Sequence, residues 1–597
     1  MRRVRTFAQS TVRQRTWPVL VDFAVFAGVI AIFYALSVVT RYWFAAPVAE
    51  AYIERSPRAL PVYAFYSLVR MGTAYVLSLI FAVSYGYIAA YNKRAEVMMI
   101  AVLDILQSIP VLSFLPGVML ATVAMFPHRQ LGLELGSILL IFTGQVWNMA
   151  FSFYSSLKAI PRELREATRI YHFSRWQRFF QLELPFSTIG LVWNSMVSVA
   201  QGWFTLMLCE MFVLNNRDFR LPGLGSYLKT AADNNDKQAM LWGLTALIGL
   251  IVLLDQLLWR PLIIWSDKFK FEQVESTSSP RSPLLALLFN STALRAVRYR
   301  VLSPLSESLS RHFAHPAPAF AHAPSQASEA ALPASAPIAS EGTQPASPVR
   351  KLIPYVIFTL IGAAVLYATA KAAMLLSTLT ASDVTLTLHA AAATLLRVFL
   401  SLLIALAWCI PAGVAIGFHP KLARYAQPIA QIAASVPATA LFPIILLAII
   451  QLGGGINTAS IVLMLMGTQW YILFNVIAGA LAIPSDMRDV STIFRFNFRE
   501  RWTAVILPGI FPYLVTGLVT ASGGAWNASI VAEYFRMNNH TYSTLGLGAQ
   551  ISLANDSGNG RLLLLSTVVM AAIVVTINRL LWKPLFRLAE SRYRLDS

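Results

Sequence analysis

Long apolar stretches constrain the fold of this 597-residue chain more than any other feature of its sequence. A helix needs about 20 residues to cross a hydrocarbon core of about 30 Å. Stretches of this kind occur near residues 19–40, 62–90, 97–124, 134–156, 186–212 and 239–264, and again near 352–378, 390–417, 427–451, 456–479, 509–533 and 562–582. Only 13% of the residues are charged, against about a quarter in a soluble domain. We predict an all-α polytopic membrane protein with about 12 transmembrane helices in two tandem six-helix repeats, which excludes an ordinary soluble enzyme.

The segment between the two sets has a different composition. Residues 276–349 are rich in Ser, Pro and Ala and poor in large apolar residues, so they have little apolar surface to bury. We interpret them as a flexible cytoplasmic linker, with a small folded domain as the alternative. The predicted division is 1–60 for an uncleaved N-terminal helix and external loop, 61–275 for the first membrane domain, 276–349 for the linker, 350–384 for the first helix of the second half, and 385–597 for the second membrane domain.

The distribution of charge predicts the topology. The chain has 47 Lys and Arg against 28 Asp and Glu, a net charge of +19, which is compatible with nucleic acid, anionic lipid or a topological signal. Most basic residues lie in loops that share one side of the membrane when the N-terminus is inside. The positive-inside rule therefore predicts two cytoplasmic termini and no nucleic-acid partner. Cys209 and Cys409 lie in apolar stretches without metal-ligand spacing, so we expect them to be packing residues.

The two halves of the chain are an internal repeat. One register, an offset of 327, relates Arg70 to Arg397 and the sequence Ser108-Ile109-Pro110 to Ser435-Val436-Pro437. A second, an offset of 323, covers Pro161 with Pro484, Pro185 with Pro508, Trp203 with Trp526, Glu210 with Glu533, and Gly223-Leu224-Gly225 with Gly546-Leu547-Gly548. Two duplicated modules predict a pseudo-two-fold transporter with its pathway at their interface. The alternative is a symmetric scaffold that transports nothing.

A loop with two prolines 24 residues apart follows the fourth apolar stretch in each half. It runs from Pro161 to Pro185 and from Pro484 to Pro508, with acidic residues first and then Arg residues between aromatic ones. Proline in the first turn and nearby acidic side chains both favour the start of a helix. We predict a short amphipathic helix lying across the membrane, which either contacts a soluble partner or rests on lipid.

These loops resemble the EAA motif of permease subunits in bacterial ABC importers. Glu166-Ala167-Thr168 with Leu184-Pro185 matches it in the first half, and Asp489-Val490-Ser491 with Leu507-Pro508 matches it more loosely in the second. The glycine of the family motif is replaced by His172 and Arg495. The "SIPxxxxxP" stretch, the Ala-Trp…Ala-Glu stretch and the "GLG" after it also resemble the nitrate/sulfonate/taurine branch of type I importers.

The resemblance implies two fused permease domains with the type I importer permease fold in the bacterial inner membrane. Two cytoplasmic ATP-binding subunits would dock on the loops, and an extracytoplasmic substrate-binding protein would deliver a small, anionic solute. The sequence contains no Gly-Lys dipeptide and hence no phosphate loop, so ATP and Mg are expected on the partner subunits and no cofactor or active site in this chain. The loop residues singled out are Pro161, Glu163, Glu166, Ala167, Thr168, His172, Leu184 and Pro185, then Pro484, Asp486, Asp489, Val490, Ser491, Arg495, Leu507 and Pro508.

Several residues within apolar stretches are candidates for lining the pathway. Acidic side chains inside a membrane usually face a bundle interior or a wet cavity. Arg residues there donate charge-assisted hydrogen bonds to anions, or pair with the acids and hold helices together. Prolines that interrupt a span are tolerated beside a cavity, or they only kink the packing. The candidates are Arg70, Pro110, Pro116, Trp203 and Glu210, with Arg397, Pro437, Pro443, Trp526 and Glu533.

Two functions are therefore compatible with the sequence. The leading prediction is the transmembrane permease subunit of an ATP-driven importer. The alternative is an ion-coupled secondary transporter in which Glu210 and Glu533 carry protons, because it too accounts for twelve spans and a two-fold repeat.

Overall fold

The computed structural model describes residues 41–45, 52–108, 111, 115–214, 217–269, 304, 363, 366–367, 369–483, 487, 490–491, 493–537 and 540–592. The predicted first span near 19–40 lies outside these residues, as does the linker 276–349 except for residue 304. Among the described residues, seven helical segments are long and apolar enough to cross a membrane: Pro57–Tyr91, Leu131–Ala159, Lys237–Ser266, Ala381–Phe418, Ile456–Ala482, Phe498–Ala532 and Gly560–Ala589. The prediction of a helical membrane fold is confirmed, while the number of twelve spans stays a prediction.

Helices dominate the first half. They are α2 (Leu60–Tyr91), α3 (Lys93–Ser108), α4 (Leu115–Met125), α5 (Leu131–Ala159), α6 (Arg162–Ile170), α7 (Arg175–Arg178), α8 (Leu184–Cys209), α9 (Leu224–Asp233), α10 (Lys237–Leu254) and α11 (Arg260–Ser266). Single π-helical turns, η3 (Phe179–Glu183) and η4 (Asp255–Trp259), precede α8 and α11. Strands β1 (Met211–Leu214) and β2 (Arg217–Arg220) form an antiparallel hairpin after α8.

The second half repeats this order. Its elements are α16 (Ala381–Phe418), α17 (Pro420–Ser435), α18 (Ala438–Gln451), α19 (Ile456–Ala482), α21 (Phe498–Glu500), α22 (Leu507–Ala532), α23 (Leu547–Asp556), α24 (Gly560–Ile577) and α25 (Lys583–Arg592). The π-helical turns η7 (Arg501–Ile506) and η8 (Asn578–Trp582) occupy the places of η3 and η4. Strands β3 (Tyr534–Met537) and β4 (His540–Ser543) form the second hairpin.

The third apolar stretch of each half is divided into two helices. Residues 97–124, expected as one span, form parts of α3 and α4, and residues 427–451 form parts of α17 and α18. In the second half Val436 follows α17 with extended backbone (ψ 118°), because the proline after it disfavours helical geometry at this residue. Pro437 itself is also extended (ψ 129°) and precedes α18, and it has no N–H to donate. In the first half Pro110 lies outside the described residues, and Pro116 is the second residue of α4.

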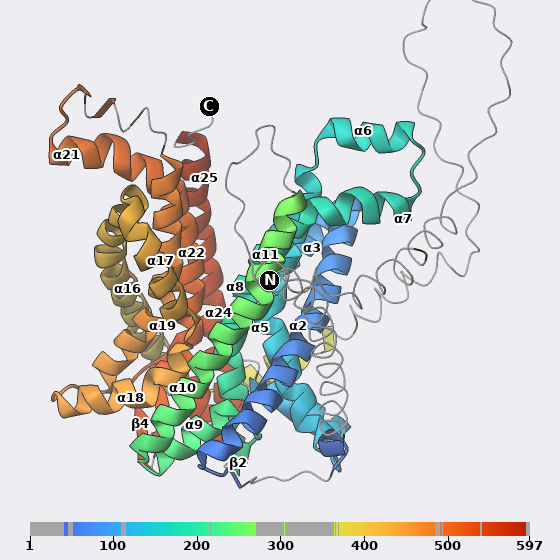
Figure 1. The fold of residues 1–597 in the computed structure, drawn as a ribbon. Helices are drawn as coiled ribbons and strands as arrows, with labels where there is room; N and C mark the ends of the chain where they lie inside the picture. The colour runs from blue at the N-terminus through green and yellow to red at the C-terminus, as the bar shows by residue number, and fades with distance from the viewer. Residues whose placement is uncertain are drawn as a thin grey trace, which may run out of the picture.

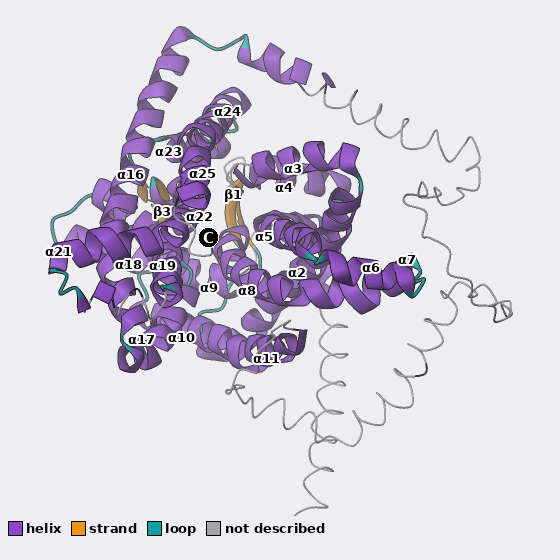
Figure 2. Ribbon diagram, turned by 90° about the horizontal axis from the view of Figure 1, so that it is seen from above, coloured by secondary structure: helices purple, strands orange, loops and turns teal. Residues whose placement is uncertain are grey.

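The two halves contact each other reciprocally. The α3 helix of the first half contacts α24 of the second, and α17 of the second contacts α10 of the first. At the centre α8 contacts α18. Figure 1 shows the two hairpins at one end of the bundle and α6, α7 and α21 at the other. Seen along the bundle in Figure 2, α6 and α7 lie on one side and α21 on the opposite side. This is the arrangement that a pseudo-two-fold repeat produces.

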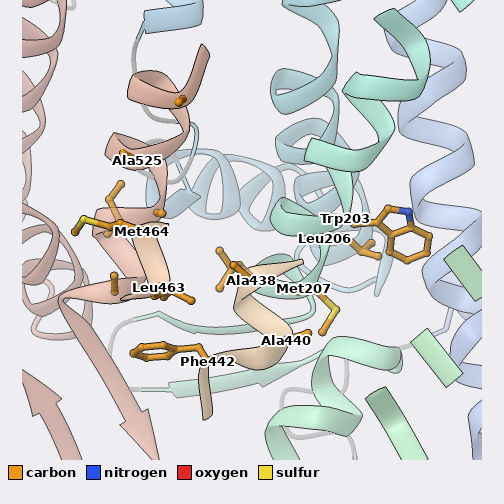
Figure 3. Close-up of a cluster of buried hydrophobic side chains, with 14 of the residues drawn as sticks. Trp203, Leu206, Met207, Ala438, Ala440, Phe442, Leu463, Met464 and Ala525 are labelled. Atoms are coloured by element: carbon orange, nitrogen blue, oxygen red, sulfur yellow. The ribbon is translucent and has the colours of Figure 1, made fainter. Parts of the chain in front are cut away.

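A shared hydrophobic core joins the halves. Figure 3 shows Ala438 and Phe442 of α18 between Met464 of α19 on one side and Leu206 and Met207 of α8 on the other. These side chains are at most 4% exposed. Buried side chains of both modules therefore meet at this contact, where the sequence predicts the pathway.

Candidate functional site: the two proline-bounded loops, two buried ion-pair clusters and a central cavity

The first loop forms a helical hairpin on the end of the bundle. Pro161 immediately precedes α6 with extended backbone (ψ 147°), and Glu163 lies in the first turn, where a carboxylate complements the helix dipole. Thr168 is the one buried residue of α6, and its Oγ1 donates to the carbonyl of Arg165 at 2.8 Å. Glu166 and Ala167 lie within α6, and the motif ends with Leu184 and Pro185 as the first two residues of α8.

The second loop is built in the same way where it is described. Pro484, Asp486 and Asp489 lie outside the described residues. Leu507 and Pro508 are the first two residues of α22. Reciprocal capping boxes start α7 and α21: Ser174 pairs with Gln177, and Asn497 with Glu500. These two caps are 323 residues apart, so the repeat extends to the local hydrogen bonds.

Both loops expose apolar side chains at matching positions. Ile170 and Tyr171 follow one another at the end of α6 and are 74% and 75% exposed. Their counterparts Ile493 and Phe494 are 73% and 71% exposed. Figure 1 shows both loops at the same end of the bundle. A repeated apolar surface at a helix end is typical of a site that contacts another protein.

The two residues that replace the motif glycine have left-handed backbone. The φ angle is 49° at His172 and 50° at Arg495. Residues other than glycine adopt left-handed backbone at a cost in free energy. The turn therefore retains the conformation that suits glycine, although another residue stands in the place of glycine. The sequence identified these positions as departures from the motif, and the structure shows that the turn itself is conserved between the halves.

A buried charged cluster attaches only the first loop to its membrane domain. Tyr91 Oη, at the end of α2, donates to Glu183 Oε1 at 2.5 Å, and Arg178 Nε donates to the same oxygen at 2.8 Å. Glu183 is fully buried. Burial acts to lower the pKa of Arg178, but Glu183 together with Tyr91 and Tyr87 outweighs it, so that pKa is raised. At the equivalent positions the second half has Phe418 and Ile506 in place of Tyr91 and Glu183. Arg501, the counterpart of Arg178, lies over the Phe418 ring at 5.9 Å, so the buried carboxylate is replaced there by an apolar side chain and the arginine contacts an aromatic ring.

A second polar contact reinforces the end of the first half that carries the loop. Glu96 of α3 accepts hydrogen bonds from Tyr154 Oη at 2.6 Å and from Lys158 Nζ at 3.0 Å, both in α5. These two hydrogen bonds, that of Tyr154 first, lower the pKa of the Glu96 carboxyl. The second half has Ala, Ile and Leu at the equivalent positions 423, 477 and 481.

At the opposite end of the first half lies a buried cluster around Arg70. Its Nε and Nη2 donate to the two carboxylate oxygens of Glu134 at 2.6 and 2.7 Å, and Nη1 donates to Glu210 Oε1 at 2.8 Å. Glu210 also accepts from Ser67 Oγ at 2.6 Å and from the backbone N–H of Gly225 at 2.7 Å. Arg70 is 1% exposed and both carboxylates are 0% exposed. The cluster joins α2, α5, α8 and the start of α9.

The second half repeats this cluster with one change. Arg397 Nη1 donates to Glu533 Oε1 at 2.8 Å, and Glu533 accepts from Thr394 Oγ1 at 2.8 Å and from the N–H of Gly548 at 2.9 Å. Asn457 stands where the first half has Glu134, and its Oδ1 accepts from Arg397 Nη2 at 2.8 Å. The first cluster therefore holds two carboxylates for one guanidinium, and the second holds one.

Each "GLG" sequence begins with glycine because the backbone there lies very close to one of these carboxylates. A Cβ on Gly223 would lie 2.2 Å from the Glu210 side chain, and one on Gly546 would lie 2.1 Å from that of Glu533. Both glycines have extended backbone, so space rather than φ selects glycine here. Glu210 and Glu533 occupy the ends of α8 and α22, which corresponds to the structural alternative raised from the sequence.

A cavity of about 560 Å³ lies between the two halves. Of the pathway candidates, Trp203 and Pro437 line it, whereas the Arg70 and Arg397 clusters, Trp526 and Pro443 do not. Trp526 and Pro443 are buried in the packing of α22 and α18. The residues that sequence reasoning missed are Glu134, Asn457, Ser67 and Thr394 in the clusters and Asn148, Gln201 and Asp255 in the cavity. Only the first four could have been found from the sequence. Glu134 and Asn457 are related by the offset of 323, and Ser67 and Thr394 by the offset of 327.

Comparison with known proteins identifies the repeated unit. The family of binding-protein-dependent transport system inner membrane components matches residues 74–258 and again 409–592, more than half of the chain. The chain belongs to this family. Its two copies confirm the internal duplication and the resemblance inferred from the loops. A member of this family is a multi-pass inner membrane component and not an enzyme, as the sequence predicts.

Three relatives within the family are similar over one module. The chain is 29% identical to the nitrate import permease protein NrtB of Leptolyngbya laminosa over 32% of its own length and 64% of the relative. It is 29% identical to the taurine transport system permease protein TauC of Escherichia coli, over 32% of this chain and 64% of the relative. It is 33% identical to the bicarbonate transport system permease protein CmpB of a Synechocystis species, over 21% of this chain and 43% of the relative. The chain thus spans less than two thirds of the length of these relatives.

Proposed function

We propose that this protein is the transmembrane permease subunit of an ATP-driven ABC importer of the bacterial inner membrane. Two cytoplasmic ATP-binding subunits, which carry ATP and Mg, dock on the two loops, and an extracytoplasmic binding protein delivers the solute. Nucleotide-driven movement of the ATPase subunits is transmitted through α6, α7 and α21 to the membrane helices. The family match supports the class of transporter, and the paired loops support the number of ATPase sites.

The observation that carries this proposal is the repeated exposed surface of the loops. The pairs Ile170–Tyr171 and Ile493–Phe494 are more than 70% exposed at equivalent positions, on opposite sides of the bundle. A soluble partner that binds both loops must itself present two equivalent sites, as a pair of ATPase subunits does. Burial of these side chains also stabilises the complex, because apolar surface is removed from water.

The proposal includes the finer topology. We place about twelve spans in the membrane, with both termini and the 276–349 linker in the cytoplasm. Residues 61–275 and 385–597 form the two permease domains. The loops and the end of α25 lie at the same end of the bundle, which supports a cytoplasmic C-terminus when the loops are cytoplasmic.

The solute in this proposal is small and carries an oxyanion group. The names of the relatives include nitrate, bicarbonate and taurine permeases, and all three solutes carry such a group. The binding protein would make most of the selection before the solute reaches this chain.

The alternative of a proton-coupled secondary transporter has weaker support. Glu210 and Glu533 are each held by an arginine, a hydroxyl and a backbone N–H, and neither lines the central cavity. A carrier that moves protons with its solute needs a carboxylate that the solute pathway reaches.

Uptake under two energy conditions tests the proposal. Cells with and without this chain are supplied with labelled nitrate, bicarbonate or taurine, after either ATP depletion or collapse of the proton gradient with ATP maintained. ATP-driven import predicts that chain-dependent uptake is lost on ATP depletion and survives loss of the gradient. Uptake that persists without ATP and stops without the gradient would establish the secondary transporter instead.

A further inference from the structure

The central cavity has a composition that restricts the solute beyond the proposed function. Its volume of about 560 Å³ far exceeds that of a four-atom oxyanion, since a water molecule takes about 30 Å³ in the liquid. Within the described part of the chain no lysine, arginine or histidine lines it, and Asp255 is the single charged residue that does. An inorganic anion would therefore meet no compensating charge in this cavity and one repelling charge.

Uncharged hydrogen-bond donors are nevertheless present for an oxyanion. Asn148 of α5 and Gln201 of α8 line the cavity, and no hydrogen bond joins either amide to another described residue. Asn475 of α19 donates one of its two amide hydrogens to the Tyr471 carbonyl, which leaves the second for a ligand. Neutral N–H groups bind an oxyanion without the charge pairing that would hold it tightly, which suits a site that must release its solute.

Asp255 and the aromatic side chains favour a cation. Trp193, Trp470 and Phe474 line the same cavity, and aromatic faces attract ammonium groups. Asp255 lies in the π-helical turn η4 with a partly exposed side chain. Its nearest cation, Arg260, is 3.5 Å away and 57% exposed, a long pairing in a solvated position.

The two modules contribute unequally to this site. The residue equivalent to Asp255 is Asn578, which does not line the cavity, and the residue equivalent to Gln201 is Gly524, which gives space in place of an amide. The cavity is thus one asymmetric site, with amide side chains from α5, α8, α17, α19 and α22 and its carboxylate on η4. An asymmetric site of this kind accepts a ligand with two different ends.

From this arrangement we propose that the cavity binds a zwitterionic organic solute, with its ammonium group toward Asp255 and the aromatic rings and its oxyanion on the amides of Asn148, Gln201 and Asn475. The inference rests on the proposed function, because it names the solute class of the same transporter. The proposal predicts that the cavity binds amino sulfonates and amino carboxylates more tightly than nitrate, bicarbonate and simple organic anions.

Three matched small molecules test the proposal on the full chain in lipid nanodiscs. Taurine carries both groups, isethionate replaces the ammonium with a hydroxyl, and nitrate is the inorganic comparison. Binding is followed by the fluorescence of the lining tryptophans and by calorimetry. We expect taurine to bind at least tenfold more tightly than isethionate or nitrate. Equal or tighter binding of isethionate or nitrate would overturn the proposal, and so would no binding of all three.

Two variants and a control assign the ends of the solute. Asp255→Asn is expected to weaken taurine binding at least tenfold and to leave isethionate unchanged or improved. Gln201→Leu is expected to weaken taurine and isethionate by similar factors. Asn578→Ala, at the repeat-related position outside the cavity, is the matched control and should keep the preference for taurine. A preference that survives Asp255→Asn contradicts the assigned orientation.

Failure of this inference is distinguishable from failure of the proposed function. A chain that binds an ATPase subunit and supports ATP-dependent uptake, but prefers isethionate or nitrate over taurine, retains the function and refutes the solute class. A chain that prefers taurine but takes it up without ATP supports the cavity site and refutes the importer.

Discussion

Arg70 and Glu210 form an ion pair with 2.8 Å between Nη1 and Oε1, and Arg397 and Glu533 form the same pair at 2.8 Å in the other half. Each arginine lies within a long apolar helix, and each carboxylate ends the helix that follows one of the two loops. Each pair therefore fixes the end of α8 or α22 that is distant from the loop against α2 or α16. In the proposed importer, movement at the loop would be transmitted along the whole helix to this fixed end.

Removal of Arg70 is expected to be more damaging than removal of Arg397. Arg70→Met leaves two buried carboxylates without a cation, while Arg397→Met leaves one. Breaking a buried ion pair by removing one partner costs about 3 to 5 kcal/mol. We expect Arg70→Met to give the lower thermal midpoint and the smaller yield of folded protein in detergent. Addition of Glu134→Asn, which copies Asn457, should partly restore the Arg70→Met protein. Equal losses for the two single variants would contradict the assigned difference.

Alanine at Gly223 or Gly546 is expected to disrupt the same clusters. The added Cβ would lie about 2 Å from the carboxylate, so the carboxylate or the turn must shift. A lower thermal midpoint should be measured for both variants. Gly249→Ala in α10 is the control, because its Cβ would meet nothing within 4 Å and alanine favours a helix. Wild-type stability of Gly223→Ala would show that the turn does not depend on this contact.

Glycine at the left-handed positions is expected to be accepted. His172→Gly and Arg495→Gly each remove a cost of about 1 to 2 kcal/mol for a side chain in left-handed backbone. We expect unchanged or slower hydrogen exchange in α6 and around residues 490–497, respectively. His172→Val, with a β-branched side chain, should speed exchange in α6. Faster exchange in both glycine variants would mean that the side chains, and not the turn, stabilise the loops.

The attachment of the first loop through Glu183 is expected to be replaceable by that of the second, in which Arg501 lies over the Phe418 ring. Glu183→Ala leaves Arg178 and Tyr91 without their buried acceptor, which should loosen α7. The double variant Tyr91→Phe with Glu183→Ile copies Phe418 and Ile506 and should retain the loop. Protease cleavage within residues 161–183 measures the difference. A double variant cleaved as fast as Glu183→Ala would show that the two halves are not interchangeable at this contact.

Sequence reasoning predicted most of the features that repeat, although it missed the repeat-related pairs Ser67 with Thr394 and Glu134 with Asn457, and it missed the features that do not repeat. Helix lengths follow from the lengths of the apolar stretches. The repeat offsets relate Arg70 to Arg397 and Glu210 to Glu533, so the arginines and carboxylates of the two clusters could be predicted as matching pairs. The break between α17 and α18 was visible only as Pro437, because an apolar run gives no sign of where a helix ends. The cavity was not predictable, since apolar periodicity carries no information on which helix of one half faces the other.

The central claim is tested most directly by purifying the full chain from its own membranes and identifying the subunits that remain bound. The account predicts two copies of a nucleotide-binding subunit that contains a G-x-x-x-x-G-K-[ST] loop and hydrolyses ATP. Scrambling residues 162–183 and 485–506 together should remove this subunit while the chain stays folded and in the membrane. An ATPase that stays bound to the folded, scrambled chain would contradict the account.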